Sequence, residues 1–273
     1  MRTVLEWHQL VGVDETIAPA PVDRFNLVEE LPAATTEPPP ATSIADTPPS
    51  VAPSQTPKPP VPPQTLPPSS DQAVKTAVGL AAGADSIDAL RVALDSFDGC
   101  ALKKTATNLV FVDGNPDARV LFIGEGPGAE EDRQGLPFVG PSGQLLDKML
   151  ASIGLERGEV IISNTVFWRP PGNRTPTPQE IATCMPFVER LIELVDPDVL
   201  VPLGGPAAKS LLGETQGIGR LRGRWFSFET SRMSHPVATT PMFHPAYLLR
   251  TPIQKRAAWN DLRLIRKKLA ESS

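Results

Sequence analysis

The chain has 273 residues, with 26 lysines and arginines, 31 aspartates and glutamates, and a formal net charge of −5. No apolar run approaches the length that spans a bilayer, and the N-terminus lacks the basic region and apolar stretch of a secretory signal peptide. Its two cysteines, Cys100 and Cys184, cannot make a disulfide framework or, alone, a tetrahedral metal site, so a cytoplasmic protein is expected.

Proline content divides the chain. Residues 32–85 are rich in proline and alanine and cannot bury enough apolar area to offset their ordering entropy, which predicts a disordered linker. Residues 1–31 are more apolar, and they are either a weakly structured end that packs loosely on the domain or a docking peptide for a protein partner. One folded domain is then expected over residues 86–273. Its net charge is near zero, because most of the acidity lies in residues 1–85.

The domain alternates two patterns. Apolar residues at helical spacing predict helices, and short uninterrupted apolar runs predict buried strands. In chain order we expect a helix at 86–97, a strand from 120, a helix at 143–153, a strand at 160–164, a helix at 179–195, a strand at 199–204, a helix at 206–212, a strand at 237–243 and a basic helix at 251–269. Strands that alternate with helices imply an α/β fold, with a parallel sheet covered on both faces.

A glycine-rich turn follows the first strand, and the domain is organised around it. Gly124-Glu-Gly-Pro-Gly128 lets the backbone turn sharply and approach a ligand, and ligands bind beyond the carboxyl ends of such strands. Glu125 and Glu131 are therefore candidates for chemistry. The stretch formally matches a dinucleotide-binding fingerprint, but the carboxylates 130–132 would repel a pyrophosphate at the helix N-terminus. Polarising a water or accepting hydrogen bonds from a neutral ligand suits them better.

Three further residues stand near strand ends or turns. His244 directly follows the last strand, where it is either a simple hydrogen-bonded residue or a functional one. Asn164 ends the second strand, and its amide can offer a donor and an acceptor to a planar heterocycle. Phe138 is either a core residue or a stacking surface for a base.

These stretches together resemble family 4 of the uracil-DNA glycosylase superfamily. The resemblance covers roughly residues 97–269 and rests on ordered motifs: Gly124-Glu-Gly-Pro-Gly128, Asp132-Arg-Gln-Gly-Leu-Pro-Phe-Val-Gly140, Gly143-Gln-Leu-Leu-Asp147, Asn164, Arg169-Pro-Pro-Gly-Asn-Arg174 and His244-Pro-Ala-Tyr-Leu-Leu-Arg250. It implies a three-layer α/β/α sandwich with a central four-stranded parallel sheet. It also implies a repair enzyme that flips uracil out of DNA and cleaves its N-glycosidic bond, leaving an abasic site. We expect the protein to be a monomer.

The resemblance also implies roles for single residues. Glu125 and the backbone of Gly124 and Gly126 lie beside the base, Glu131 acts nearby, and one of the two carboxylates orients water or stabilises the sugar cation. Phe138 stacks on the base, Asn164 hydrogen-bonds its edge, and His244 stabilises it as it leaves. For DNA binding we expect phosphate contacts from Arg169, Arg174 and Arg250, and an apolar wedge formed by Leu248 or Leu249.

Two positions depart from the family pattern. Family 4 members usually hold an iron–sulfur cluster on four cysteines, of which only Cys100 and Cys184 are present here. Phe97 and Trp168 occupy the other two positions, and two thiolates cannot hold such a cluster. We therefore expect no cofactor and no metal. The small Gly126 is expected to leave room for bases other than uracil.

Two other classes of protein stay open at this point. A binding module could recognise uracil or damaged DNA without turnover, and an α/β protein could bind a nucleotide at the glycine turn.

Overall fold

The computed structural model describes residues 70–271. The segment predicted at 1–31, and the predicted linker up to residue 69, lie outside these described residues. Within the rest of the predicted linker, helix α2 (Ser70–Gly83) is formed, so the prediction of disorder there is wrong. The reason is a stripe of small residues: Ala73, Ala77 and Ala81 recur at every fourth position and are all buried.

The sheet has six strands in the order β1-β3-β2-β4-β6-β5. Their bounds are β1 Asp113–Gly114, β2 Val120–Gly124, β3 Ile161–Asn164, β4 Val199–Pro202, β5 Phe226–Phe228 and β6 Val237–Thr239. The four central strands are parallel, as expected, but β1 and β5 add antiparallel edges, so the sheet is mixed and not four-stranded. Both edge strands are too short to give a periodic apolar pattern.

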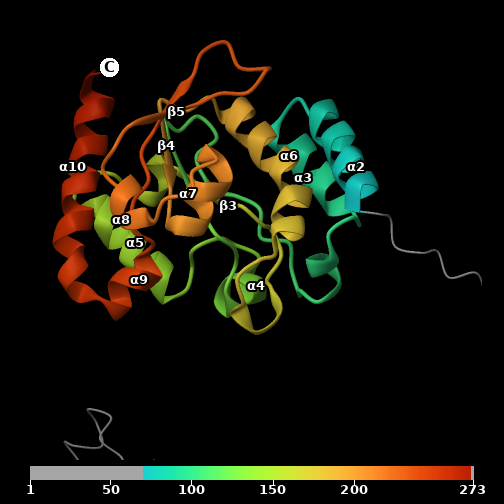
Figure 1. Cartoon of the computed structure of the whole chain (residues 1–273), viewed down its shortest axis with the longest axis horizontal. Helices are drawn as coiled ribbons and strands as arrows, with labels where there is room; N and C mark the ends of the chain where they lie inside the picture. Colours follow the sequence, from blue (N-terminus) through green and yellow to red (C-terminus); the bar gives the residue numbers. More distant parts are fainter. Residues whose placement is uncertain (1–69, 272–273) are drawn as a thin grey trace, which may run out of the picture. The chain divides into compact units, whose positions relative to one another are not determined.

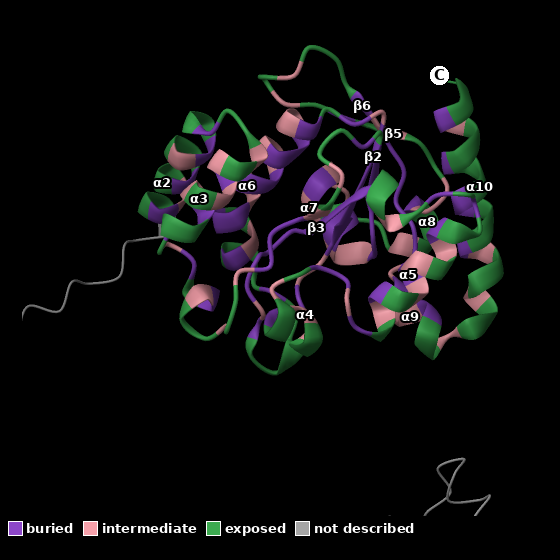
Figure 2. Cartoon of the chain, turned by 180° about the vertical axis from the view of Figure 1, so that it is seen from behind, coloured by how far each residue is buried: buried purple, intermediate pink, exposed green. Residues whose placement is uncertain are grey.

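Helices cover both faces of the sheet, which confirms the three-layer α/β/α arrangement (Figure 1). Alternate residues of β2 point to opposite faces: Leu121 and Ile123 pack with one group of helices, Val120 and Phe122 with the other. Strands β2, β3 and β4 are buried throughout (Figure 2). The first group comprises α2, α3 (Ile87–Ser96) and α6 (Pro178–Val195); the second comprises α5 (Pro141–Ala151), α9 (Pro245–Arg250) and α10 (Lys255–Glu271).

Short elements connect these layers. They are the helices α4 (Ala129–Gln134), α7 (Gly205–Leu212) and α8 (Ile218–Leu221), and the 3-10 turns η1 (Ala101–Lys104), η2 (Arg157–Glu159), η3 (Pro171–Asn173) and η4 (Pro252–Gln254). None of the described helices is long and apolar enough to cross a membrane.

The end of the last parallel strand differs from the prediction. Strand β6 stops at Thr239, and beyond it only an isolated bridge joins Met242 to Leu203. Pro241 interrupts the ladder because proline has no backbone N–H to donate. The freed chain turns at His244 into the six-residue helix α9, which is too short to show a periodic pattern. The predicted terminal helix 251–269 accordingly starts later, at Lys255.

Candidate functional site

A cavity of about 970 Å³ opens beyond the carboxyl ends of β2, β3 and β4. It brings together most of the residues selected from the sequence: Glu125, Gly126, Glu131, Phe138, Asn164, Arg174, His244 and Arg250. Among the residues that sequence reasoning missed, Asn173, Thr175, Tyr247 and Gln254 also line it. Arg169, Leu248 and Leu249 are not among the lining residues. The parallel topology explains the convergence, because it places all these strand ends at one edge of the sheet.

Asn164 has an unusual environment for a buried amide. Its side chain is 1% exposed, and neither the amide nitrogen nor the amide oxygen has a hydrogen-bond partner within residues 70–271. Buried polar groups are normally paired, and leaving one unpaired costs about 1–3 kcal/mol. Gly124 makes the space, since a Cβ at that position would lie 2.5 Å from Asn164 Oδ1. An amide held in this way is suited to a polar ligand that enters the pocket.

Phe138 has a backbone conformation that is rare for a large side chain, with a φ of 54°. Its ring is buried and lies 5.5 Å from the His244 ring, centroid to centroid, at an interplanar angle of 33°. Arg157 stabilises this turn by donating a 3.0 Å hydrogen bond to the carbonyl oxygen of Phe138. Arg157 is itself anchored by ion pairs with Asp113 and Asp147. Sequence reasoning missed Arg157, because its partners lie far away along the chain.

The Phe138 turn also depends on Gly143 in helix α5. A Cβ on Gly143 would lie 1.7 Å from the Phe138 carbonyl oxygen, so the turn would have to move. Alanine normally stabilises a helix by about 1 kcal/mol relative to glycine.

We expect Gly143→Ala to do the opposite and to lower the free energy of unfolding by about 1–3 kcal/mol, the usual cost of overpacking. Gly79→Ala in α2 is the matched control, since nothing lies within 4 Å of a Cβ there and the substitution should stabilise. Urea unfolding of both variants measures the difference. Equal stabilisation by the two alanines would show that the Phe138 turn does not need Gly143.

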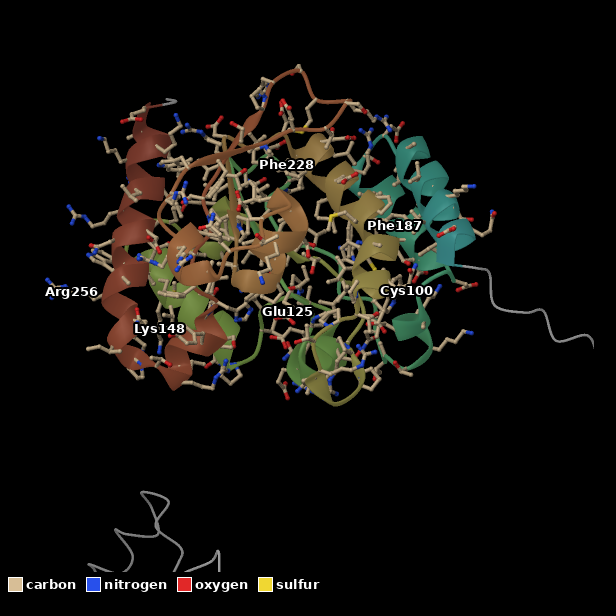
Figure 3. All side chains as sticks on the ribbon, viewed as in Figure 1. Cys100, Glu125, Lys148, Phe187, Phe228 and Arg256 are labelled. Atoms are coloured by element: carbon tan, nitrogen blue, oxygen red, sulfur yellow. The ribbon has the colours of Figure 1, made fainter. Side chains whose placement is uncertain are left out.

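The two candidate carboxylates differ in their surroundings. Glu131 accepts hydrogen bonds from the backbone N–H groups of Gly128 (3.1 Å), Val139 (3.0 Å) and Gly140 (2.9 Å). It therefore joins the glycine turn to the turn that carries Phe138, and both of its oxygens are used. Glu125 is half-buried at the pocket wall, between the two helical sides of the domain (Figure 3). Burial raises the pKa of Glu125, and a hydrogen bond with Thr175 opposes that shift. These surroundings favour Glu125 for contact with water.

His244 caps the N-terminus of α9. Its Nδ1 accepts a 3.1 Å hydrogen bond from the backbone N–H of Ala246, so in the neutral ring the proton is on Nε2. Burial, followed by the positive charge of Arg250, lowers the pKa of His244 to about 4. The ring is consequently neutral near pH 7 and has one N–H to donate. Gly204 allows the His244 ring to pack closely, because a Cβ added at Gly204 would lie only 3.1 Å from the His244 Cβ.

The residues expected to bind DNA fall into two groups. Arg174 lines the pocket but forms a bidentate ion pair with Glu180, and Arg169 donates to Asn173 Oδ1. Both guanidinium groups therefore have partners within the protein. Arg250 is exposed at the pocket rim.

The two leucines of the proposed wedge also differ. Leu248 is fully buried and packs in the core under α5 and α10, so its assignment as a wedge is wrong. Leu249 remains 43% exposed.

Gly126 does not leave the open space expected of it. A Cβ on Gly126 would lie 2.8 Å from Val166 Cγ2, with Pro176 and Pro170 next nearest. The pocket is therefore closed in that direction by Val166 and Pro170, which lie between β3 and η3, and by Pro176, which follows η3.

The four positions that hold the cluster in family 4 form a packed core here. The sulfurs of Cys100 and Cys184 lie 3.9 Å apart, and both residues are buried. The Phe97 ring packs 5.2 Å from Phe187, and the indole of Trp168 packs edge-on to Phe167. Within residues 70–271 no group of three or more His, Cys, Asp or Glu side chains could hold a metal ion. These residues do not fit a four-thiolate cluster, because aromatic rings fill two ligand positions.

The fold and pocket define an α/β protein with an aromatic ring, an unpaired amide and a neutral histidine at one edge of its sheet. It belongs to the uracil DNA glycosylase superfamily, whose family profile matches residues 111–263. A Thermotoga maritima protein named type-4 uracil-DNA glycosylase is 44% identical over 152 residues, which are 55% of this chain and 77% of that protein. A protein of the same name from Archaeoglobus fulgidus is 39% identical over 185 residues, 66% of this chain and 92% of that protein.

A third relative, from Sulfurisphaera tokodaii, also carries the type-4 name and is 37% identical over 187 residues, 67% of this chain and 84% of that protein. These relatives confirm the resemblance to family 4 that the motifs indicated.

Proposed function

We propose that this protein removes uracil from DNA by hydrolysing the N-glycosidic bond, leaving an abasic site. The observation that carries the proposal is the amide of Asn164, which has no partner within residues 70–271 and is buried in the same pocket as Phe138 and the neutral His244. The relatives named type-4 uracil-DNA glycosylase support it. We propose that the protein acts as a cytoplasmic monomer, and a protein partner for residues 1–31 stays a prediction from the sequence.

Recognition of the base follows from the geometry of the pocket walls. A uracil ring that lies against Phe138 would present its polar edge to the Asn164 amide. The amide N–H donates to a base carbonyl oxygen while the amide oxygen accepts from the ring N–H, which satisfies both orphaned atoms. Cytosine reverses this donor and acceptor pattern, so it would match the amide only after the amide rotates by 180°.

The chemical step needs a group at each end of the breaking bond. As the C1′–N1 bond breaks, its electron pair leaves with the base, and negative charge spreads to the base oxygens. His244 donates a hydrogen bond from its Nε2–H to that charge. The lowered pKa means that the ring does so in its neutral form near pH 7. Glu125 orients the water whose oxygen adds to C1′ and takes up the proton that this water loses, and its negative charge stabilises the sugar cation.

A product assay tests the proposal. An end-labelled oligonucleotide with one uracil is incubated with the full chain and then treated with hot alkali, which cleaves DNA only at abasic sites. We expect cleavage at the uracil, and none in matched strands with thymine or cytosine there. If the uracil strand stays intact although the protein binds it, the protein is a binding module. A shift in melting temperature with a nucleotide, but not with uracil, would favour the nucleotide-binding alternative.

The raised pKa of Glu125 predicts how the rate depends on pH. The proton that Glu125 takes up as the pH falls through its pKa removes the charge that acts on water, so the excision rate should decrease on the acid side. In Glu125→Gln that decrease should be absent, leaving only a change near pH 4, where protonation of His244 at Nδ1 breaks its hydrogen bond with the Ala246 N–H. Single-turnover excision rates of both proteins, measured from neutral pH to below pH 4, show whether this decrease is present. If the rate of Glu125→Gln decreases with acid as the wild-type rate does, another group is responsible for the decrease.

We also propose that the protein folds and acts without an iron–sulfur cluster. The support is the aromatic packing at positions 97 and 168, where the family has cysteines. Protein purified without oxygen should contain negligible iron, and Phe97→Ala should cost about 3–5 kcal/mol of stability, as expected for a buried ring. Iron analysis and urea unfolding check the two parts. Stoichiometric iron would contradict the packing argument.

A further inference from the structure

The most exposed large apolar side chain among the described residues is Ile253, which is 82% exposed. It lies in the turn η4, directly after α9 and before α10. A side chain exposed to this degree stabilises the fold very little, because it removes almost no apolar area from water.

The residues around Ile253 place it at the mouth of the pocket. Arg250 and Gln254, which flank the turn in sequence, both line the cavity that contains Asn164 and His244. The turn itself is well supported. Backbone N–H groups of Thr251 and Gln254 donate to Tyr247 (2.9 Å) and Thr251 (3.0 Å), and Pro252 restricts the backbone. Ile253 is therefore an apolar side chain on a rigid turn beside the base pocket.

The charge around this turn is positive. Arg250, Lys255 and Arg256 are all exposed, and the nearest acidic residue along the chain, Asp261, is buried and paired with Arg222. Arg256 extends from α10 toward solvent (Figure 3). An apolar side chain within a basic surface is suited to DNA, where the cations contact phosphates and the apolar group can enter the base stack.

We propose that Ile253 is the wedge that fills the base stack when uracil is flipped into the pocket. This inference rests on the proposed function. A base inside a duplex must be unstacked at a cost of a few kcal/mol before it can reach Asn164 and His244. Ile253 occupies the vacated position and opposes the return of the base. Leu248 cannot do so because it is buried, and Leu249 is the less exposed neighbour.

The test compares duplex and single-stranded substrates of the same sequence. Ile253→Ala should lower the single-turnover excision rate on duplex DNA by about tenfold or more, because the gap is no longer filled. On single-stranded DNA, where there is no opposite strand to restack against, the rate should stay within about twofold of wild type. Ile253→Leu, which keeps an apolar side chain of the same size, should retain most of the duplex activity.

Two controls separate this role from a structural one. Val92→Ala changes another exposed apolar residue, on α3, and should alter neither rate. A pyrene nucleotide opposite the uracil fills the stack itself and should restore Ile253→Ala to near the wild-type rate. Equal losses on duplex and single strand, or no loss on either, would overturn the wedge assignment. No excision of any substrate by the wild-type protein would instead contradict the proposed function.

Discussion

His244→Ala is expected to lower the excision rate on saturating DNA by about 10²–10³, with little change in DNA affinity. The imidazole donates to a charge that develops only as the base leaves, so its loss affects the transition state and not the ground state. The structure strengthens this expectation in one respect. Since Ala246 N–H occupies Nδ1, the proton of the neutral ring is on Nε2, and no second tautomer competes.

Arg250→Ala is the matched comparison. Arg250 is the last residue of helix α9, which His244 caps, and its replacement is expected to have the opposite effects on rate and affinity. It should weaken DNA binding and reduce its salt dependence while leaving the rate at saturation largely intact. Single-turnover rates and binding curves at two salt concentrations measure both effects. If His244→Ala cleaves at the wild-type rate on saturating DNA, His244 is not the stabiliser of the leaving base.

Asn164→Ala is expected to reduce uracil excision by about 10²-fold without lowering the melting temperature. The loss of activity follows from removing hydrogen bonds to a base that becomes negatively charged, worth about 1.5–3 kcal/mol each. The stability should be kept because the wild-type amide is buried without a partner in the described part of the chain. Removing such a group relieves a desolvation penalty of about 1–3 kcal/mol, which offsets the small cavity left behind.

Ser163→Ala provides the control on the same strand. Ser163 is also fully buried, but its hydroxyl donates a 2.6 Å hydrogen bond to the carbonyl oxygen of Phe111. Its replacement should lower the melting temperature and leave excision nearly unchanged, the reverse of Asn164→Ala. Thermal unfolding and single-turnover rates of both variants give a two-by-two comparison. A clear loss of stability in Asn164→Ala with unchanged excision would make Asn164 a structural residue.

The site also separates the roles of its two carboxylates. Sequence reasoning placed Glu125 and Glu131 together and left open which one acts on water. The three backbone amides that Glu131 binds come from the glycine turn and from the turn after Phe138. We therefore propose that Glu131 positions these two turns, whereas Glu125 accepts no such backbone hydrogen bond within residues 70–271.

The sequence by itself determined the central strands, the glycine turn and the candidate residues at the strand ends. These features are local: an uninterrupted apolar run predicts a buried strand, and parallel strands bring their carboxyl ends to one edge. Asn164 and His244 could be selected for that reason alone, without knowledge of their contacts. The two antiparallel edge strands, β1 and β5, were not predicted because strands of two and three residues have no measurable period.

Only the tertiary structure decided which side chains are covered and what each polar group contacts. Leu248 and Ile253 are both apolar residues near a basic helix, yet packing of α9 buries the first completely and leaves the second exposed. Likewise, Arg157 reaches the Phe138 turn only because the η2 turn is folded against it. Burial and hydrogen bonding between residues distant in the chain depend on how the layers pack, which no local pattern records.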